Sequence, residues 1–437
     1  MKKILSLICF ALVLSAAAFA QADVYPAKEY HGLTFIKDVT VHVGNGQVIE
    51  HATIKINDGK IEQVGTNIAI PSGDVKVIDA AGKQAYPGLI LPKTDLGLKE
   101  IGSGVRGSND YRELGEINTD VRSITAYNTD SKIINTLKAN GILLANVAPE
   151  GSLLTGSSTV VQLDAWNWED ATYKPDVAMH FMMPSLMPRR NRFGGRGFGG
   201  QADSDPEKEA LAKIEEVKSF FREAKAYLNE PSHTETNLKF EALRPLFEKK
   251  QKLFIHCDMV KQMLIAIDFV KEFAIDVVIV GGSESWQIAD LLKQNNIAVI
   301  LGREHALPTM ADDDIDQPFK TPYMLQKAGV LFALNDDFEE TRYRNLAFNA
   351  GTAAAYGLTK EQALQAITFN AAKILGIDDK TGTIEAGKDA NIVISKGDIL
   401  DMRTSIITDA FIQGRKVSLE NKQTQLYERY EYKYGLK

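Results

Sequence analysis

The sequence predicts an α/β protein with a mostly parallel sheet in a large domain and a small β domain that both chain ends build. Two observations support this. Short apolar runs alternate with amphipathic helical stretches through the middle of the chain, and this alternation favours a parallel sheet. Hairpin-like β patterns occur near the start and return near the end. The length of 437 residues is sufficient for one large domain and a smaller one.

The first twenty residues are typical of a secretory signal peptide. Lys2 and Lys3 precede an apolar run, and Ala18-Phe19-Ala20 offers a small-residue cleavage site before Gln21. The apolar run is short for a membrane span, and the cleavage site disfavours the alternative of an uncleaved anchor. We therefore expect an exported protein, periplasmic or secreted, that loses residues 1–20 and has no membrane span.

The composition is that of an ordinary soluble protein, 44% hydrophobic and 24% charged. Without the signal peptide, 50 basic residues become 48 against 57 acidic residues, so the net charge moves from −7 to −9. A mildly acidic chain gives no reason to expect a nucleic-acid partner. We interpret the Arg/Gly-rich stretch 187–202 as a surface loop. Cys9 leaves with the signal, so Cys257 is alone and no internal disulfide is expected.

Residues 30–86 predict an antiparallel β segment. Short alternating apolar runs there are separated by Asn45-Gly46 and Asp58-Gly59, which are hairpin turn signals. A similar pattern returns at 388–419. We therefore expect residues 30–86 and 385–420 to form one β domain.

The stretch 87–384 carries most of the expected strands and helices. One helix, 359–375, has clear ends, because Thr359 and Gln362 form a capping box and Gly376 follows it. Eight strand candidates allow a (β/α)₈ barrel, although the pattern alone leaves a doubly wound open sheet as an alternative. The strand candidates are 84–90, 142–147, 158–163, 177–183, 252–256, 275–280, 297–301 and 329–334.

Three stretches resemble one known family. "GKQAYPGLILPKTDLGL" looks like the first barrel strand of the amidohydrolase superfamily, in particular its exported imidazolonepropionase-like branch, where the text is close to P-G-L-I-D-x-H-x-H. "TVHVGNGQVIEHATIKINDGKIEQVG" and "AITFNAAKILGIDDKTGTIEAGKDANIVI" are similar to the opening and closing segments of that family. The resemblance implies a (β/α)₈ TIM-type barrel over 87–384 with a composite β-sandwich built from both chain ends.

The family implies a metal site whose ligands this chain keeps only in part. The family places two His after the first strand, one after the fifth, one after the sixth and an Asp after the eighth. His256 and Asp336 occupy the fifth- and eighth-strand positions, whereas Lys93 and Asp95 replace the first two His. The sixth strand ends in 281–283, which offers no imidazole. In the family, the metal activates a water and the Asp takes its proton during attack on a carbonyl.

We therefore expect at most one divalent metal ion, zinc or a harder ion, on His256, Asp336 and Asp95. The standard binuclear centre is not expected, because the ammonium of Lys93 repels a dication. Lys93 could replace the charge of the metal by pairing with a carboxylate, most readily Asp336. It could also polarise a substrate carbonyl, or act as a base if burial lowers its pKa. Asp336 and Lys93 are the candidate catalytic residues.

Two further histidines are candidates for substrate binding. His180 lies within a strand, so its direction depends on register. His305 follows the seventh strand, at the carboxyl ends where barrel sites lie. Cys257 is not a candidate nucleophile, because neighbouring strand residues face opposite sides and His256 would face the site. The loops 105–131 and 164–173 could line a pocket, the second with two tryptophans, or could pack as a satellite core.

Three functions remain open on the sequence. The first is an exported hydrolase that cleaves an amide or other C–N bond in a small or cyclic substrate. The second is a metal-free pseudoenzyme or ligand-binding protein that keeps the barrel. The third is a partner of another envelope protein, such as an active paralogue. A small-molecule substrate is expected, and a homo-oligomer is possible. Metal content separates the first from the second, and copurification separates the third.

Overall fold

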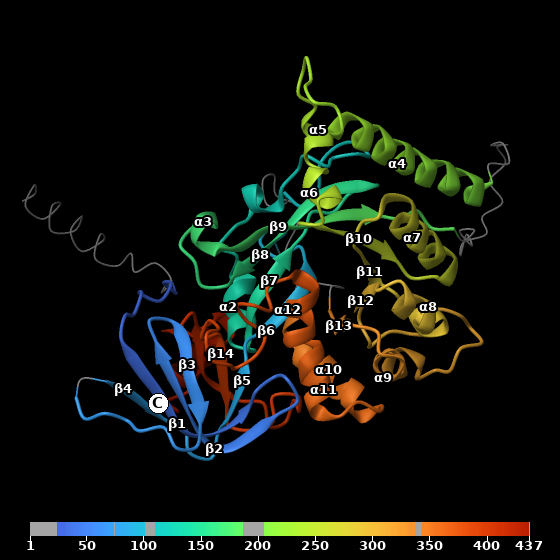
Figure 1. The fold of residues 1–437 in the computed structure, drawn as a ribbon. Helices are drawn as coiled ribbons and strands as arrows, with labels where there is room; N and C mark the ends of the chain where they lie inside the picture. The colour runs from blue at the N-terminus through green and yellow to red at the C-terminus, as the bar shows by residue number, and fades with distance from the viewer. Residues whose placement is uncertain (1–23, 74, 101–109, 187–204, 337–341, 437) are drawn as a thin grey trace, which may run out of the picture.

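The computed structural model describes residues 24–73, 75–100, 110–186, 205–336 and 342–436. The predicted signal peptide and the Arg/Gly-rich loop lie outside the described residues, as does the first part of the 105–131 loop. Within the described part, no helix is both long enough and apolar enough to cross a bilayer. The structure contains two sheets of eight strands each, and Figure 1 shows them with their covering helices.

The first sheet joins the two chain ends, as the sequence predicts. β14 pairs with β5, antiparallel, and β5 pairs with β1, so the carboxyl-terminal strands continue the amino-terminal sheet. Figure 1 shows the blue strands of the first segment beside the red β14. Its strands are β1 (Leu33–His42), β2 (Val48–Asn57), β3 (Lys60–Gly65), β4 (Lys76–Asp79), β5 (Gln84–Pro87), β14 (Ile392–Ser395), β15 (Ile407–Ile412) and β16 (Arg415–Lys416).

The second sheet is the nearly closed barrel, so the predicted TIM-type fold is confirmed. Seven of the eight strand candidates correspond to strands in it, whereas the first, 84–90, covers β5 of the first sheet and only the start of β6. The order of the strands along the barrel sheet follows the chain. The strands are β6 (Leu89–Thr94), β7 (Ile142–Val147), β8 (Leu154–Gln162), β9 (Thr172–Met182), β10 (Lys252–Cys257), β11 (Val277–Gly281), β12 (Ala298–Leu301) and β13 (Phe332–Leu334). The predicted domain boundaries stay predictions.

One strand differs from an all-parallel barrel. β8 is antiparallel to both β7 and β9. The connections explain this, because 148–153 and 163–171 are too short for a parallel crossover, which needs a dozen or more residues. Because β8 runs antiparallel to β7, its last residue, Gln162, pairs with Leu144 near the start of β7. The loop 164–173 that follows β8 therefore lies at the amino-terminal end of the barrel. Trp166 there is 61% exposed and stacks on Tyr25.

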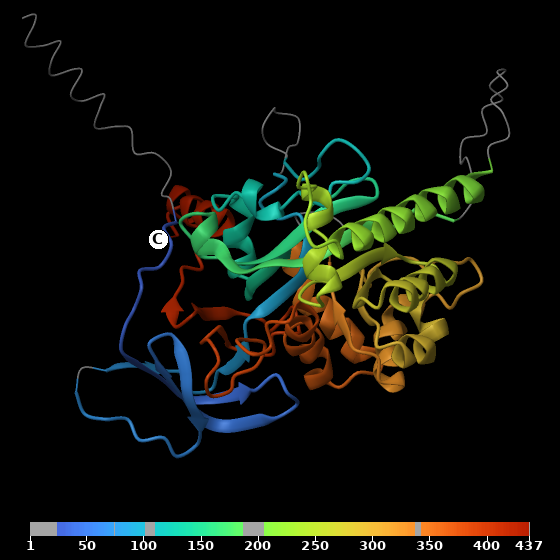
Figure 2. The same ribbon diagram turned by 45° about the horizontal axis from the view of Figure 1, so that its top comes forward.

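Helices cover the outside of the barrel, and the second view in Figure 2 shows the long helix α4 running along one side. The helices are α2 (Lys132–Lys138), α3 (Trp168–Ala171), α4 (Pro206–Leu228), α5 (Leu238–Glu241), α6 (Arg244–Phe247), α7 (Val260–Phe273), α8 (Ala289–Gln294), α9 (Gln317–Ala328), α10 (Leu346–Ala355), α11 (Lys360–Ala366), α12 (Phe369–Leu375) and α13 (Lys422–Lys433). Short 3₁₀ turns are η1 (Ser123–Ala126), η2 (Ser285–Ile288) and η3 (Tyr343–Asn345).

The predicted single helix 359–375 is two helices. The capping box of Thr359 and Gln362 and the left-handed Gly376 end are both present. The break falls at Thr368, whose hydroxyl donates to the Leu364 carbonyl. The preceding carbonyl, of Ile367, accepts from the backbone N–H of Ile90 in β6. Docking on the first barrel strand therefore interrupts a helix that local sequence alone would continue.

α12 closes the amino-terminal end of the barrel and leaves the other end for a site. Ala371 and Ile374 pack with the inward-facing residues of the barrel strands, such as Phe254. Lys252, at the start of β10, donates to the Ile374 carbonyl at 2.6 Å. A ligand therefore has access to the interior from the carboxyl ends of the parallel strands, where sites of barrel enzymes lie.

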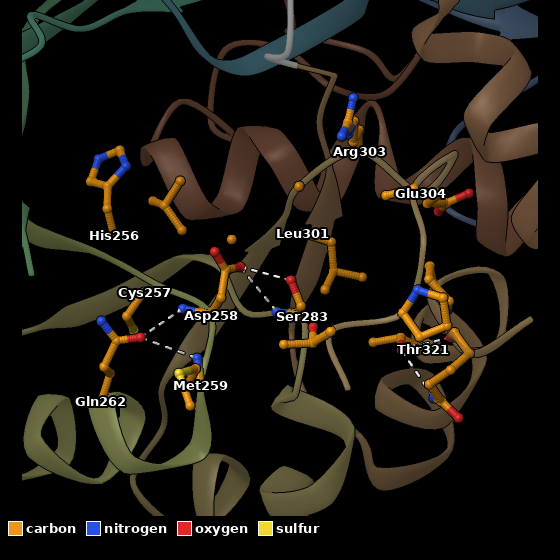
Figure 3. A pocket seen from close by; sticks show the side chains of 18 of the residues that line it. His256, Cys257, Asp258, Met259, Gln262, Ser283, Leu301, Arg303, Glu304 and Thr321 are labelled. Atoms are coloured by element: carbon orange, nitrogen blue, oxygen red, sulfur yellow. Dashed lines mark hydrogen bonds between the residues drawn. The ribbon is translucent and has the colours of Figure 1, made fainter. Parts of the chain in front are cut away.

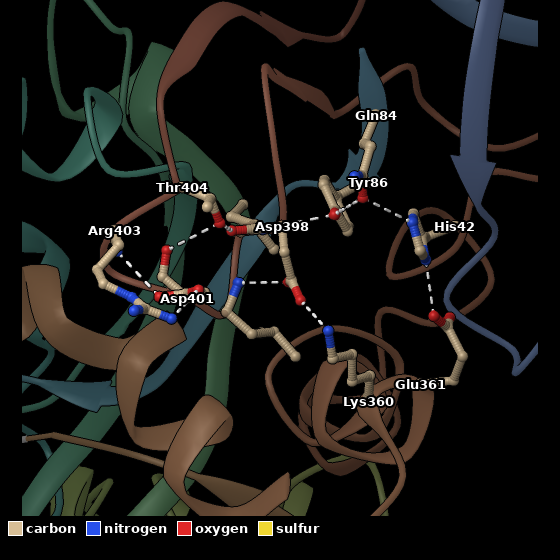
Figure 4. Close-up of polar contacts among 11 residues, drawn as sticks. His42, Gln84, Tyr86, Lys360, Glu361, Asp398, Asp401, Arg403 and Thr404 are labelled. Carbon is tan, nitrogen blue, oxygen red and sulfur yellow. Dashed lines mark hydrogen bonds and ion pairs between the residues drawn. The ribbon is translucent and has the colours of Figure 1, made fainter. Parts of the chain in front are cut away.

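A polar network fixes the β domain to the barrel helices (Figure 4). His42 of β1 contacts Glu361 of α11 at 2.6 Å through Nδ1 and Gln84 of β5 at 3.0 Å through Nε2. Tyr86 donates to the same Gln84 oxygen, and its ring stacks on His42. These contacts hold β5, and the strand that follows it, against α11.

Candidate functional site

The end of β6 carries a buried cation. Lys93 is 6% exposed, and its Nζ donates to Glu150 Oε1 at 3.5 Å. Glu150 lies in the turn between β7 and β8, which the reversed strand brings to this end of the barrel. A buried ammonium requires a nearby anion, since desolvation of an unpaired charge is unfavourable. The hairpin therefore supplies a counter-charge that the sequence analysis did not foresee.

Asp95 follows Lys93 and is tied to a different part of the chain. The hydroxyl of Tyr343 donates to Asp95 Oδ1, and Lys99 Nζ lies 3.8 Å from Oδ2. Burial raises the pKa of this carboxyl, and the Tyr343 hydrogen bond acts in the opposite direction. Asp95 thus holds η3 against β6, with both of its oxygens engaged.

Two histidines face the barrel interior beside Lys93. His180 of β9 is fully buried, and its Nδ1 lies 2.9 Å from Nε2 of His256 in β10. Burial, and then the charge of Lys93, lowers the pKa of His180 to about 3. Burial, His180 and Lys93 together hold the pKa of His256 well below its usual value. Both imidazoles are therefore neutral at neutral pH, and Lys93 is the cation of this group.

Asp336 faces the helical layer. It is fully buried and follows β13. Its Oδ2 accepts from Asn349 of α10 at 3.1 Å, and its Oδ1 lies 3.7 Å from Arg342 Nε. Lys93 pairs with Glu150, and the expected pairing of Lys93 with Asp336 stays a prediction.

A cavity of about 750 Å³ opens at this mouth. His256, Asp258 and Ser283 line it from the ends of β10 and β11, as Figure 3 shows. Ser283 donates to Asp258 through its hydroxyl at 2.7 Å. Apolar side chains from β9, from the end of β12 and from the segment after it complete the wall, among them Met182, Leu301 and Leu307. The cavity has a size suited to a small molecule.

The segment after β12 contributes Glu304 rather than His305. Glu304 lines the cavity and is 2% exposed. His305 is exposed and its Nε2 lies 2.9 Å from the hydroxyl of Thr352 in α10. The structure therefore does not bring His305 to the group formed by Lys93 and the two buried histidines. Glu304 was not predicted as a site residue, because His305 was the candidate in this segment.

Cys257 follows His256 but packs on the other side of the strand. It belongs to the core between the barrel and the helices, as strand alternation predicts, and it also lines part of the cavity. Burial raises the pKa of its thiol well above its usual value. The thiol is therefore unsuited to act as a nucleophile.

The described residues do not fit a metal centre. No three His, Cys, Asp or Glu side chains among them are grouped so that they could hold an ion. His180 and His256 use nitrogens on each other, Asp95 is engaged by Tyr343, and Asp336 faces α10. The predicted trio of His256, Asp336 and Asp95 is therefore not arranged as a ligand set in the described part of the chain.

The neutral histidine pair predicts sensitivity to acid. His180 has a pKa of about 3 when folded and about 6.5 when unfolded. Between these values only the unfolded chain binds the proton, so stability is complete above pH 6.5 and falls as the pH drops. From pH 7 to pH 5 we expect a loss of about 2 kcal/mol from His180. Urea unfolding at both pH values should show a smaller loss for His180→Gln. Equal losses in the two proteins would contradict the assignment.

Comparisons with known proteins agree with this fold. Residues 280–418 match the model described as "Amidohydrolase family". An imidazolonepropionase from Geobacillus sp. (strain WCH70) is 25% identical over 379 residues, 79% of this chain and 84% of the relative. One from Thermoplasma volcanium is 39% identical over 82 residues, 18% of this chain and 20% of the relative. The crystal structure of an amidohydrolase from Thermotoga maritima MSB8 superposes with a TM-score of 0.75 at 25% identity, covering 88% of this chain and 99% of that one.

Proposed function

Because the chain belongs to the amidohydrolase superfamily and is imidazolonepropionase-like, we propose that it hydrolyses a C–N bond in a small amide or cyclic amide. Members of this superfamily commonly use metals such as zinc. Here the proposal assigns the electrophilic role to Lys93, with at most one metal ion bound to the protein.

The observation that carries the proposal is the buried cation beside two neutral imidazoles. Lys93 is 6% exposed, and its charge lowers the pKa of both His180 and His256. In a low-dielectric site a fixed positive charge stabilises an oxyanion far more than it would in water. A carbonyl oxygen placed near Nζ would gain this stabilisation as it becomes negative during attack.

The proposed hydrolysis needs no oxidant or reductant, and its protons are conserved. A water oxygen attacks the carbonyl carbon, and its proton passes to Asp336, which is the terminal acceptor. The charge that develops on the carbonyl oxygen is stabilised by Lys93. The C–N bond then breaks, and the nitrogen leaves with the proton returned from Asp336. The products are a carboxylic acid and an amine, or one ring-opened molecule that carries both groups.

The test combines a hydrolysis screen with elemental analysis. Protein purified without chelators or added metal is assayed against cyclic imides, lactams and dipeptides, and its metal content is measured on the same sample. Hydrolysis with no more than one equivalent of metal supports the proposal. Two equivalents of zinc that survive dialysis would overturn the role of Lys93, and no turnover on any class would overturn the hydrolase.

A metal-free ligand-binding barrel is the second candidate. Asp336 does not line the cavity in the described part of the chain, while His256 and Glu304 do. A protein that only binds would keep such a cavity and need no proton acceptor within reach. Saturable binding of a screened amide without turnover would favour this candidate.

Removal of the Lys93 charge is expected to lower kcat about a hundredfold, as loss of one oxyanion-stabilising group does. Lys93→Met keeps the length of the side chain and removes the ammonium. Steady-state kinetics with the best substrate from the screen measure the effect. Lys132→Met, on the exposed start of α2, is the matched control and should retain wild-type kcat. Equal rates for Lys93→Met and wild type would remove Lys93 from the mechanism.

A further inference from the structure

Glu304 is a buried carboxyl group that has no hydrogen-bond partner in the described part of the chain. It follows β12 and is 2% exposed. Neither of its oxygens receives a hydrogen bond from the described residues. Figure 3 shows it in the cavity wall next to Arg303 and Leu301. An unpaired carboxylate in such a place would be strongly unfavourable, so a neutral carboxyl is the stable form.

Asp336 is a carboxyl group with the opposite surroundings, and it follows β13, the strand paired with the β12 strand that precedes Glu304. It accepts a hydrogen bond from Asn349 and lies 3.7 Å from the guanidinium Nε of Arg342. Both contacts favour its charged form. Burial, and then the charge of Asp336, raises the pKa of Glu304 well above its usual value. Two carboxyl groups whose surroundings favour different protonation states are suited to act as an acid and a base.

The positions of the two groups differ as well. Asp336 is 0% exposed and faces α10, whereas Glu304 forms part of the cavity wall. We propose that Glu304 relays protons between a substrate in the cavity and Asp336, and so acts as the general acid toward the leaving nitrogen. This inference rests on the proposed hydrolysis, because it gives the terminal base access to the substrate.

The relay conserves protons over one cycle. When water attacks the carbonyl carbon, its proton passes to one oxygen of Glu304, while the proton of Glu304 passes through a bridging water to Asp336, because the two carboxyl groups, both in the described part of the chain, share no direct hydrogen bond. Both carboxyl groups are then neutral. When the C–N bond breaks, Glu304 gives a proton to the nitrogen and receives one back from Asp336. The pair returns to one neutral and one charged group.

Glu304→Gln is the decisive variant, because an amide of the same shape cannot pass a proton on. We expect kcat for an amide substrate to fall about a hundredfold, in the range of lost general acid–base catalysis, while KM changes little. A p-nitrophenyl ester of the same acid needs no proton on its leaving group but still needs the relay when water attacks, so its kcat should fall by a smaller factor than that of the amide. Glu284→Gln is the matched control, since Glu284 is 6% exposed, lies outside the cavity wall and accepts from the Val260 N–H. Wild-type kcat for the amide in Glu304→Gln would overturn the relay while leaving the hydrolase intact.

Infrared spectroscopy tests the same residue without turnover. At neutral pH the wild type and Glu284→Gln should share a carbonyl band of a protonated carboxyl that Glu304→Gln lacks. Asp95 can contribute a second such band, so the difference between the proteins is the readout. If no substrate is hydrolysed, the proposed function fails and this difference still decides whether Glu304 holds the proton. Identical spectra for wild type and Glu304→Gln would overturn the inference.

Discussion

Asp336→Asn is expected to lower kcat by about a thousandfold or more, within the span known for loss of acid–base catalysis. The amide keeps an oxygen that can accept from Asn349, so the local packing should persist. What disappears is the final acceptor of the proton that the attacking water loses. The effect should lie in kcat rather than KM, because Asp336 lies outside the cavity wall among the described residues.

The control for this variant removes a carboxylate elsewhere. Asp268→Asn, on the exposed face of α7, should keep the wild-type rate. The double variant Asp336→Asn with Glu304→Gln should be little worse than Asp336→Asn alone, because residues that act as a unit give non-additive losses. Retention of most activity by Asp336→Asn would assign the base to another group, and the neutral His256 at the cavity would be the next to test.

Lys93→His combined with Asp95→His is expected to create metal binding. The change removes a cation beside His180 and His256 and adds two imidazole ligands. Structural zinc sites gain about 10–16 kcal/mol from four ligands, or about 3 kcal/mol for each ligand. Two added ligands then correspond to about a 10⁴-fold gain in affinity. Competition with a fluorescent chelator measures that gain directly.

The matched control is Lys93→Gln with Asp95→Asn. It removes the same charges and adds no imidazole, so it should bind zinc no better than about tenfold over wild type. If both double variants bind equally well, repulsion by Lys93 alone explains the weak affinity. If neither binds, the backbone of β6 does not direct positions 93 and 95 toward His256.

The strands were predictable because each is an apolar run with flanking turn signals. Their directions were not predictable from such runs, and β8 shows why. Its antiparallel course follows from the six residues between β7 and β8, and the sequence analysis placed the start of that strand four residues too late. The break at Thr368 was equally hidden, because a tertiary hydrogen bond from Ile90 to the Ile367 carbonyl overrides good local helix signals.

The site was predictable in position and less so in its pairings. Strand ends located Lys93, Asp95 and His256, which the structure places at one end of the barrel. The pairing of Lys93 with Glu150 depends on the reversed strand β8, whose direction no local pattern predicts. Glu304 belongs to no sequence motif. What identifies it is that its carboxyl group is buried without a hydrogen-bond partner among the described residues, and this is visible only in the three-dimensional structure.

β5 of the β domain leads directly into β6 of the barrel, so the β domain helps to hold Lys93 in position. Only Gly88 separates these strands, and a Cβ at that position would come within 2.7 Å of the Leu143 side chain. β14 holds β5 on one side, and the Gly88 N–H donates to the Asn391 carbonyl at 2.8 Å. Lys93 lies five residues after Gly88, so its position depends on contacts made by the carboxyl-terminal strands. Loosening of β14 or of the Asn391 contact is therefore expected to disturb the Lys93 ammonium at the site.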